Sequence, residues 1–157
     1  ESAGAVDVAE VVRKIQRAKH GQEPVPELKL EEQVIAKGHE DRIERVIGHL
    51  VQNAIDATGK EGSVRVSLQK VDGFAAIEVA DTGSGMSAEF ARERLFKPFQ
   101  TTKQGGMGIG AYESYQYVQE LGGDILVDSA VGVGTTMRIL LPLHETRDPN
   151  AEKGALA

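Results

Sequence analysis

The chain has 157 residues, of which 40% are hydrophobic, 27% are charged and none is cysteine. This length fits one domain with its own core, and the lack of cysteine excludes disulfides, zinc–thiolate sites and a thiol nucleophile. The net charge of −6 argues against a general nucleic-acid-binding surface. The chain has 18 glycines, which suggest loops with a function, but only four phenylalanines, three tyrosines and no tryptophan.

In the first half of the chain, hydrophobic periodicity predicts two helices and four strands. Apolar residues at positions 8, 11, 12 and 15 have helical spacing, and Asp7 before them is a suitable N-cap. A longer apolar stripe predicts a helix over 40–58, with Gly59 at its C-terminal end. Asp72-Gly73 is a hairpin-turn signal. The strands are expected at 27–30, 33–37, 64–69 and 74–79.

The second half begins with a glycine-rich stretch over 81–110, in which only a short piece near 88–94 has helical spacing. A helix over 108–121 and strands at 124–129 and 135–141 are expected after it. Sequential hairpins together with grouped helices favour an α/β two-layer sandwich over a doubly wound parallel sheet.

Three polar side chains share one face of the predicted helix over 40–58. His49, Asn53 and Asp56 lie at i, i+4 and i+7, opposite the apolar stripe. An Asn carbonyl oxygen suits Mg²⁺, which keeps several waters and completes its shell with substrate phosphates. A solvated helix face explains the same residues, and both interpretations stay open at this point.

Asp81 ends an apolar strand and precedes a loop with glycines at positions 83 and 85. A carboxylate there can accept a hydrogen bond from an amine such as that of adenine, and Gly83 would let a flat ligand approach the backbone. An ordinary turn is the alternative.

Two segments, 83–88 and 106–111, match the Gly-x-Gly-x-x-Gly/Ala dinucleotide pattern. Neither is followed by the parallel strand and acidic residue that a Rossmann unit needs, so the match is weak. The second segment opens a helix, however, and the free N–H groups of a helix start can hold phosphate. A surface loop is the alternative. Side chains nearby that could add phosphate contacts are Lys97, Thr101, Thr102 and Lys103.

The order of these motifs resembles that of the GHKL nucleotide-binding superfamily. Residues 49–57 (His-Leu-Val-Gln-Asn-Ala-Ile-Asp-Ala) resemble the N box, and 81–86 resemble the G1 box. Residues 96–99, Phe-Lys-Pro-Phe, resemble the F box of sensor histidine kinases, and 106–110 resemble the G2 box. Gly134-Thr135-Thr136 is similar to the terminal motif, with Thr136 in the adenine-side position. The Asn-Ala-x-Asp-Ala form is similar to the nitrogen-sensor branch of kinases, and 106–114 resemble the PrsK kinases of the exosortase/PEP-CTERM system.

The resemblance implies a Bergerat (GHKL) fold, a mixed and mainly antiparallel sheet backed by helices, with ATP held under a lid. It implies that Asn53 binds Mg²⁺, that Asp81 binds the adenine amine, and that His49, Asn53 and Lys103 serve catalysis. The residues that it places at the ATP site are Asn53, Asp56, Ala57, Asp81, Gly83, Gly85, Met86, Phe96, Thr101, Thr102, Lys103, Gly106, Met107, Gly108, Ile109, Gly110 and Thr136.

The function that the resemblance implies is that of the ATP-binding catalytic domain of a two-component sensor histidine kinase. That domain would span residues 5–143, with 144–157 as a tail, and would phosphorylate a histidine on a dimerisation domain outside this chain. No H box is recognisable, because His39-Glu40 lacks the expected proline. His49 stands where the superfamily's ATPases carry the glutamate that activates water. Its role therefore stays open between a phosphate contact, a base and packing. The alternative is a degenerate GHKL module that binds nucleotide, or only a protein, without kinase activity.

The expected partners are the kinase's own phosphoacceptor helices and a response regulator, with no nucleic acid. The full-length protein is expected to be homodimeric and membrane-anchored, with this domain in the cytoplasm and monomeric as a fragment. The expected cofactors are ATP and Mg²⁺.

Overall fold

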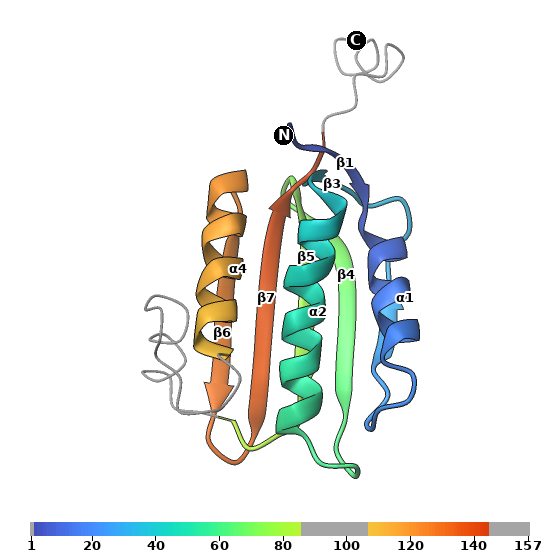
Figure 1. The fold of residues 1–157 in the computed structure, drawn as a ribbon, viewed down its shortest axis with the longest axis vertical. Helices are drawn as coiled ribbons and strands as arrows, with labels where there is room; N and C mark the ends of the chain where they lie inside the picture. Colours follow the sequence, from blue (N-terminus) through green and yellow to red (C-terminus); the bar gives the residue numbers. More distant parts are fainter. Residues whose placement is uncertain (1, 86–106, 145–157) are drawn as a thin grey trace.

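A computed structural model describes the backbone of residues 2–85 and 107–144, and their side chains except those of 107–111. Figure 1 shows the elements of these two ranges in their arrangement. In chain order they are β1 (Gly4–Asp7), α1 (Val8–Ala18), β2 (Glu27–Leu30), β3 (Ile35–Gly38), α2 (Glu40–Ala57), β4 (Val64–Val71), β5 (Phe74–Asp81), α4 (Met107–Leu121), β6 (Asp124–Ala130) and β7 (Gly134–Pro142).

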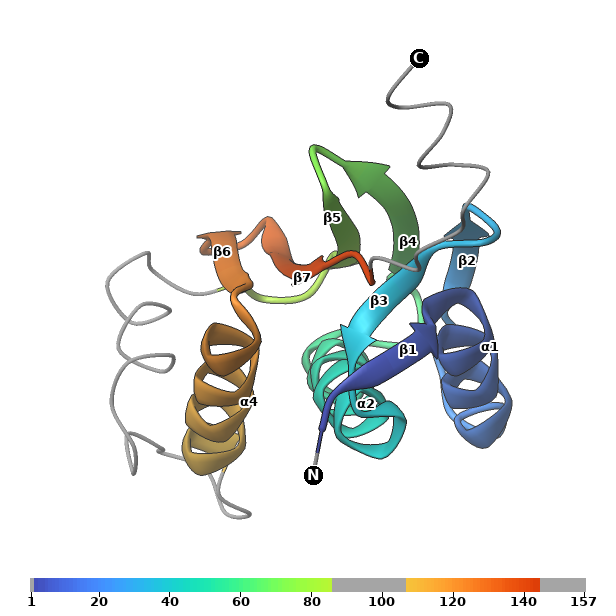
Figure 2. The same ribbon diagram turned by 90° about the horizontal axis from the view of Figure 1, so that it is seen from above.

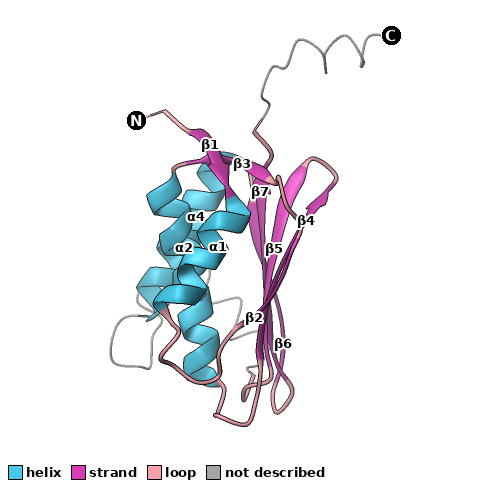
Figure 3. Ribbon diagram, turned by 90° about the vertical axis from the view of Figure 1, so that its right-hand side faces the viewer, coloured by secondary structure: helices cyan, strands magenta, loops and turns pink. Residues whose placement is uncertain are grey.

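The helices and the main sheet form two layers, as the sequence predicts (Figure 3). The main sheet has five strands in the order β2-β4-β5-β7-β6. Only β2 and β4 pair in parallel, whereas the other three pairs are antiparallel, so the sheet is mixed and mainly antiparallel. A separate antiparallel ribbon of β1 and β3 crosses the end of the helical layer (Figure 2). The predicted two-layer sandwich is therefore confirmed.

The core lies between the two layers and follows from the periodicity of the elements. Alternate residues of β4 and β5 point towards the helices, and the apolar stripe of α2 packs against them. Ile47 of α2 and Ile77 of β5 are fully buried. Asp7 caps α1 as predicted, since its Oδ1 accepts a hydrogen bond from the Glu10 amide at 3.3 Å.

The structure extends β4, β5, β6, β7 and α4 by one or two residues beyond their predicted bounds, and it differs more clearly at three other places. β1 was not predicted, because four residues paired with β3 some thirty positions away carry no local pattern. β3 begins at Ile35 rather than at 33, because Gln33 has a positive φ of 61° that interrupts an extended strand. α2 ends at Ala57, one residue early, because Thr58 is already extended. The helical piece expected near 88–94 lies outside the described residues.

The hairpin predicted at Asp72-Gly73 is confirmed. Both residues have positive φ angles, 50° and 84°, which suit a two-residue turn between twisted antiparallel strands. The described chain ends at His144, whose amide donates to the Ile35 carbonyl at 2.9 Å. Residues 145–157 are not described, so the domain bounds of 5–143 stay a prediction.

Candidate functional site

Asp81 is the last residue of β5, the central strand of the sheet, and its side chain faces the helical layer. This orientation follows from strand alternation, because Ile77 and Val79 on the same face are buried in the core. Its Oδ1 accepts hydrogen bonds from the amides of Gly83, at 2.8 Å, and Thr135, at 3.3 Å. Both donors bind the same oxygen, which leaves Oδ2 to receive a donor from a ligand.

Burial also changes the acidity of this carboxyl group. Removal of the side chain from water raises the pKa of Asp81 above its ordinary value, and the two backbone hydrogen bonds lower it in part. A half-buried, oriented acceptor at the end of a central strand is typical of a site that recognises a donor group on a small ligand.

The loop after β5 lies against the C-terminal end of α2. A Cβ atom at Gly83 would come within 2.3 Å of the Ala57 carbonyl oxygen, so only glycine fits at this position. The sequence predicts that this glycine lets a flat ligand approach the backbone. In the structure the nearest neighbour of Gly83 is the backbone of Ala57. The small size of Gly83 therefore allows the loop to pack against the end of α2.

The other side of the same loop contacts the turn between β6 and β7. Gly85 has a φ of 70°, and a Cβ there would lie 2.0 Å from the Ala130 carbonyl oxygen. The amide of Gly132 donates to the Ser84 carbonyl at 2.7 Å. The end of α2, the end of β5 and the β6–β7 turn thus meet at one end of the fold, the lower end in Figure 1.

The threonine paired with Asp81 is Thr135, whereas the sequence places Thr136 at the ATP site, and that assignment stays a prediction. The β5–β7 register places Thr135 opposite Asp81 and Thr136 opposite Ala80. Successive strand residues face opposite sides of a sheet, so Thr136 points away from the helical layer. The sequence could have shown which threonine faces the helices. Thr135 is separated from the core residues Ile139 and Leu141 by an even number of positions, so all three lie on the same face of the strand.

The three polar residues predicted on α2 lie on its outer side, with different exposure. His49 and Asn53 are half-buried, and Asp56 is exposed next to Ala57. The Gln52 side-chain amide donates to Asp56 Oδ1 at 2.9 Å and fixes that carboxylate. His49 lies at a hollow of about 110 Å³ between α2 and α4, to which Ser114 and Tyr117 also contribute.

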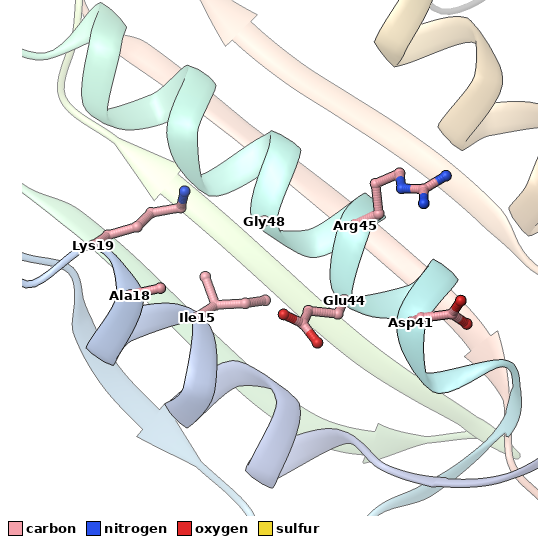
Figure 4. Close-up of a pocket in the computed structure, with 7 residues that line it drawn as sticks. All are labelled: Ile15, Ala18, Lys19, Asp41, Glu44, Arg45 and Gly48. Carbon is pink, nitrogen blue, oxygen red and sulfur yellow. The ribbon is translucent and has the colours of Figure 1, made fainter.

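A second hollow, of about 310 Å³, lies between α1 and α2 and is shown in Figure 4. It contains none of the predicted site residues, and acidic and basic side chains both line it. The lining residues are Ile15, Ala18, Lys19, Asp41, Glu44, Arg45 and Gly48.

The predicted phosphate-binding residues are only partly described. Met107, Gly108, Ile109 and Gly110 form the first turn of α4, as expected for a helix start that offers free N–H groups. The predicted site residues outside the described ranges are Met86, Phe96, Thr101, Thr102, Lys103 and Gly106. Within 2–85 and 107–144, no group of three or more His, Asp or Glu side chains could hold a metal ion.

A two-layer sandwich with this aspartate, this glycine loop and this helix start has the features of a nucleotide-binding domain. Residues 38–145 match the family model described as "Histidine kinase-, DNA gyrase B-, and HSP90-like ATPase", and the chain belongs to this family. The predicted GHKL fold and the recognition as a histidine kinase catalytic ATP-binding domain are confirmed. The finer assignment to PrsK-like kinases stays a prediction.

Two relatives with similar sequences are sensor proteins that are much longer than this chain. The C4-dicarboxylate transport sensor protein DctB of Rhizobium meliloti is 40% identical over 108 residues, which are 68% of this chain and 17% of that protein. The sensor histidine kinase ZraS of Escherichia coli K12 is 36% identical over 110 residues, which are 69% of this chain and 23% of ZraS. The chain therefore spans about a fifth of these relatives.

Solved structures show the same fold over nearly the whole chain. The mycobacterial sensor histidine kinase MprB superimposes with a TM-score of 0.74 at 26% identity, covering 92% of this chain and 99% of that one. The catalytic domain of histidine kinase ThkA gives 0.77 at 23% identity, covering 90% and 96%. None of the helices in the described ranges has the length and apolar character needed to cross a membrane.

Proposed function

We propose that this chain binds Mg-ATP and, within a longer sensor kinase, transfers the γ-phosphoryl group to a histidine on a separate helical domain. The observation that carries the proposal is the orientation of Asp81. Its Oδ1 is held by two backbone amides, and its Oδ2 is left for the ligand. A carboxylate oxygen fixed in this way accepts from the exocyclic amine of adenine and repels a carbonyl oxygen at the same place.

Asn53 is the residue suited to the phosphate end of ATP. It precedes Ala57 by one helical turn and so lies on the side of α2 where the Gly83 loop makes contact. Its carbonyl oxygen is a suitable ligand for Mg²⁺, which proteins usually hold through one or two side chains together with substrate phosphates and water. Bound there, Mg²⁺ would neutralise charge on the phosphates.

The first turn of α4 supplies amides to the phosphates, and the family resemblance adds Thr101, Thr102 and Lys103. His49, one turn before Asn53, stands where the related ATPases carry a glutamate base. Without that glutamate the site has no carboxylate base at this position to activate water, so we expect slow ATP hydrolysis.

The acceptor histidine lies outside this chain in our proposal. Of the four histidines, none has the context of an H box. His39 is in addition engaged with Tyr117, whose hydroxyl lies 2.9 Å from its Nδ1. We propose that the acceptor lies on dimerisation helices of the longer protein, which would be homodimeric, membrane-anchored and active on a response regulator, with this domain in the cytoplasm.

The test is incubation with γ-labelled ATP, first of this chain alone and then with the histidine-bearing helical domain of the longer protein. We expect acid-labile label only on the added domain, and none when Asn53→Ala is used. Holding a nucleophile beside the phosphoryl group lowers the barrier by about 7–11 kcal/mol, so the separated chain should bind ATP without phosphorylating itself. Label on the chain alone, lost on changing one of its own histidines, would contradict the proposal.

A further inference from the structure

We propose that Ser129 adds to the base selectivity that Asp81 provides, by fixing the direction in which the Thr135 hydroxyl hydrogen-bonds. This inference rests on the proposed binding of ATP at Asp81. It makes Ser129 a positioning residue, which acts on the ligand through Thr135 and need not touch the ligand itself.

The two hydroxyl groups form a close pair inside the β6–β7 hairpin. Ser129 and Thr135 are paired in the register of the two strands, and their Oγ and Oγ1 atoms are 2.7 Å apart. Thr135 is buried, with 8% of its surface exposed, and it is also the cross-strand neighbour of Asp81 on β5. Ser129, Thr135 and Asp81 therefore follow one another across three neighbouring strands.

Each hydroxyl group has one proton, which helps to assign the donor in the hydrogen bond between Ser129 and Thr135. Ser129 Oγ lies 3.2 Å from the Gly134 carbonyl oxygen, which can only accept, so the Ser129 proton is used there. Either oxygen could be the donor in the shorter contact, and we assign its proton to Thr135, whose hydroxyl then donates to Ser129. Thr135 Oγ1 consequently presents lone pairs, and no proton, towards the site.

The wall of the site next to β5 and β7 thus carries two acceptors, Asp81 and Thr135. An exocyclic amine, as in adenine, supplies the protons that two acceptors need. A carbonyl oxygen in the same position, as in hypoxanthine, would face only lone pairs. If Ser129 lost its hydroxyl, Thr135 could turn its proton towards the site and donate to that carbonyl, and the discrimination would weaken.

The experiment measures dissociation constants for ATP and ITP, which differ in the amine and the carbonyl, and compares their ratio. In Ser129→Ala we expect the preference for ATP over ITP to fall about threefold to tenfold, as for one neutral hydrogen bond. Ser129→Thr keeps the hydroxyl and should retain the wild-type ratio. Ser67→Ala, which removes a hydroxyl from the other face of the sheet, is the matched control and should also retain it.

The ratio of the two dissociation constants distinguishes a change in selectivity from a general disruption of the site, because such a disruption would weaken the binding of ATP and ITP equally. A wild-type preference that is unchanged in Ser129→Ala overturns the inference, as does a wild-type ratio near one. If Ser129→Ala does not fold, Thr135→Val removes the acceptor itself, and an unchanged ratio there overturns the inference as well. Failure of the wild type to bind either nucleotide would instead overturn the proposed function.

Discussion

The hydroxyl group of Tyr117, on α4, lies 2.9 Å from both the backbone nitrogen and the Nδ1 atom of His39, the residue before α2. The hydroxyl accepts from the amide and can donate to a neutral imidazole. Arg42 covers the Tyr117 ring at 4.0 Å from its centre. Two residues 78 positions apart in the sequence thereby fasten the start of one helix to the side of another.

Removal of this hydroxyl should destabilise the fold. Tyr117→Phe removes the oxygen that contacts the His39 amide and Nδ1, and we expect the free energy of unfolding to fall by about 1–3 kcal/mol. Urea denaturation measures the change. Tyr112→Phe, on the same helix, removes an exposed hydroxyl that accepts from Gln116 at 3.1 Å and should change stability by less than about 0.5 kcal/mol. Equal losses in the two variants would show that the contact with His39 contributes nothing.

The contact between Gly83 and α2 predicts a strong effect of one added methyl group. Gly83→Ala would place a Cβ atom 2.3 Å from the Ala57 carbonyl oxygen, so the loop or the helix end must move. We expect a loss of about 1–3 kcal/mol in the free energy of unfolding, together with weaker ATP binding. Thermal unfolding and a nucleotide titration measure the two effects.

Gly59→Ala is the control for this change, because a Cβ there meets no atom within 4 Å. It lies two residues beyond Ala57 and should alter neither measurement. A stable Gly83→Ala variant with normal ATP affinity would mean that the loop does not need its close contact with α2.

The raised pKa of Asp81 predicts that this residue costs stability near neutral pH. Burial raises the folded-state pKa above the ordinary value of 3.8, so the folded protein holds the proton more tightly than the unfolded chain. The associated stabilisation is complete at pH values below the unfolded pKa and is lost as the pH rises through the folded one. The asparagine of Asp81→Asn does not titrate, so the variant does not lose this stabilisation as the pH rises.

The free energy of unfolding of Asp81→Asn, relative to the wild type, should therefore increase as the pH is raised from roughly 3 to 7. Urea denaturation at several pH values measures this difference. A difference that decreases over the same range would mean that the hydrogen bonds from Gly83 and Thr135 outweigh burial.

The sequence predicted those parts of the fold that depend on local patterns. The apolar stripes of α1 and α2 and the turn at Asp72-Gly73 each occupy consecutive residues, so their periodicity could be recognised directly. β1 depends on pairing with β3, far away in the chain, and no local pattern marks it. A strand of four residues is too short to show alternation.

The sequence motifs point to individual residues of the candidate site, but they do not show how the strands that carry those residues pair. Asp81 was identified because a carboxylate after an apolar strand has a chemical reason to be there. The motif points to Thr136, and only the β5–β7 register shows that Thr135 is the threonine paired with Asp81. Ser129 was missed, since a hydroxyl pair across a hairpin is visible only when the strands are paired.

The central claim is that this chain binds Mg-ATP through Asp81, and an equilibrium titration tests it most directly. We expect saturable binding by the wild type and an affinity about 10–100-fold lower in Asp81→Asn, corresponding to one charged hydrogen bond of about 1.5–3 kcal/mol. Asp128→Asn, which changes an exposed carboxylate on β6, should bind like the wild type. Equal affinities in wild type and Asp81→Asn, or no binding by the wild type, would contradict the account.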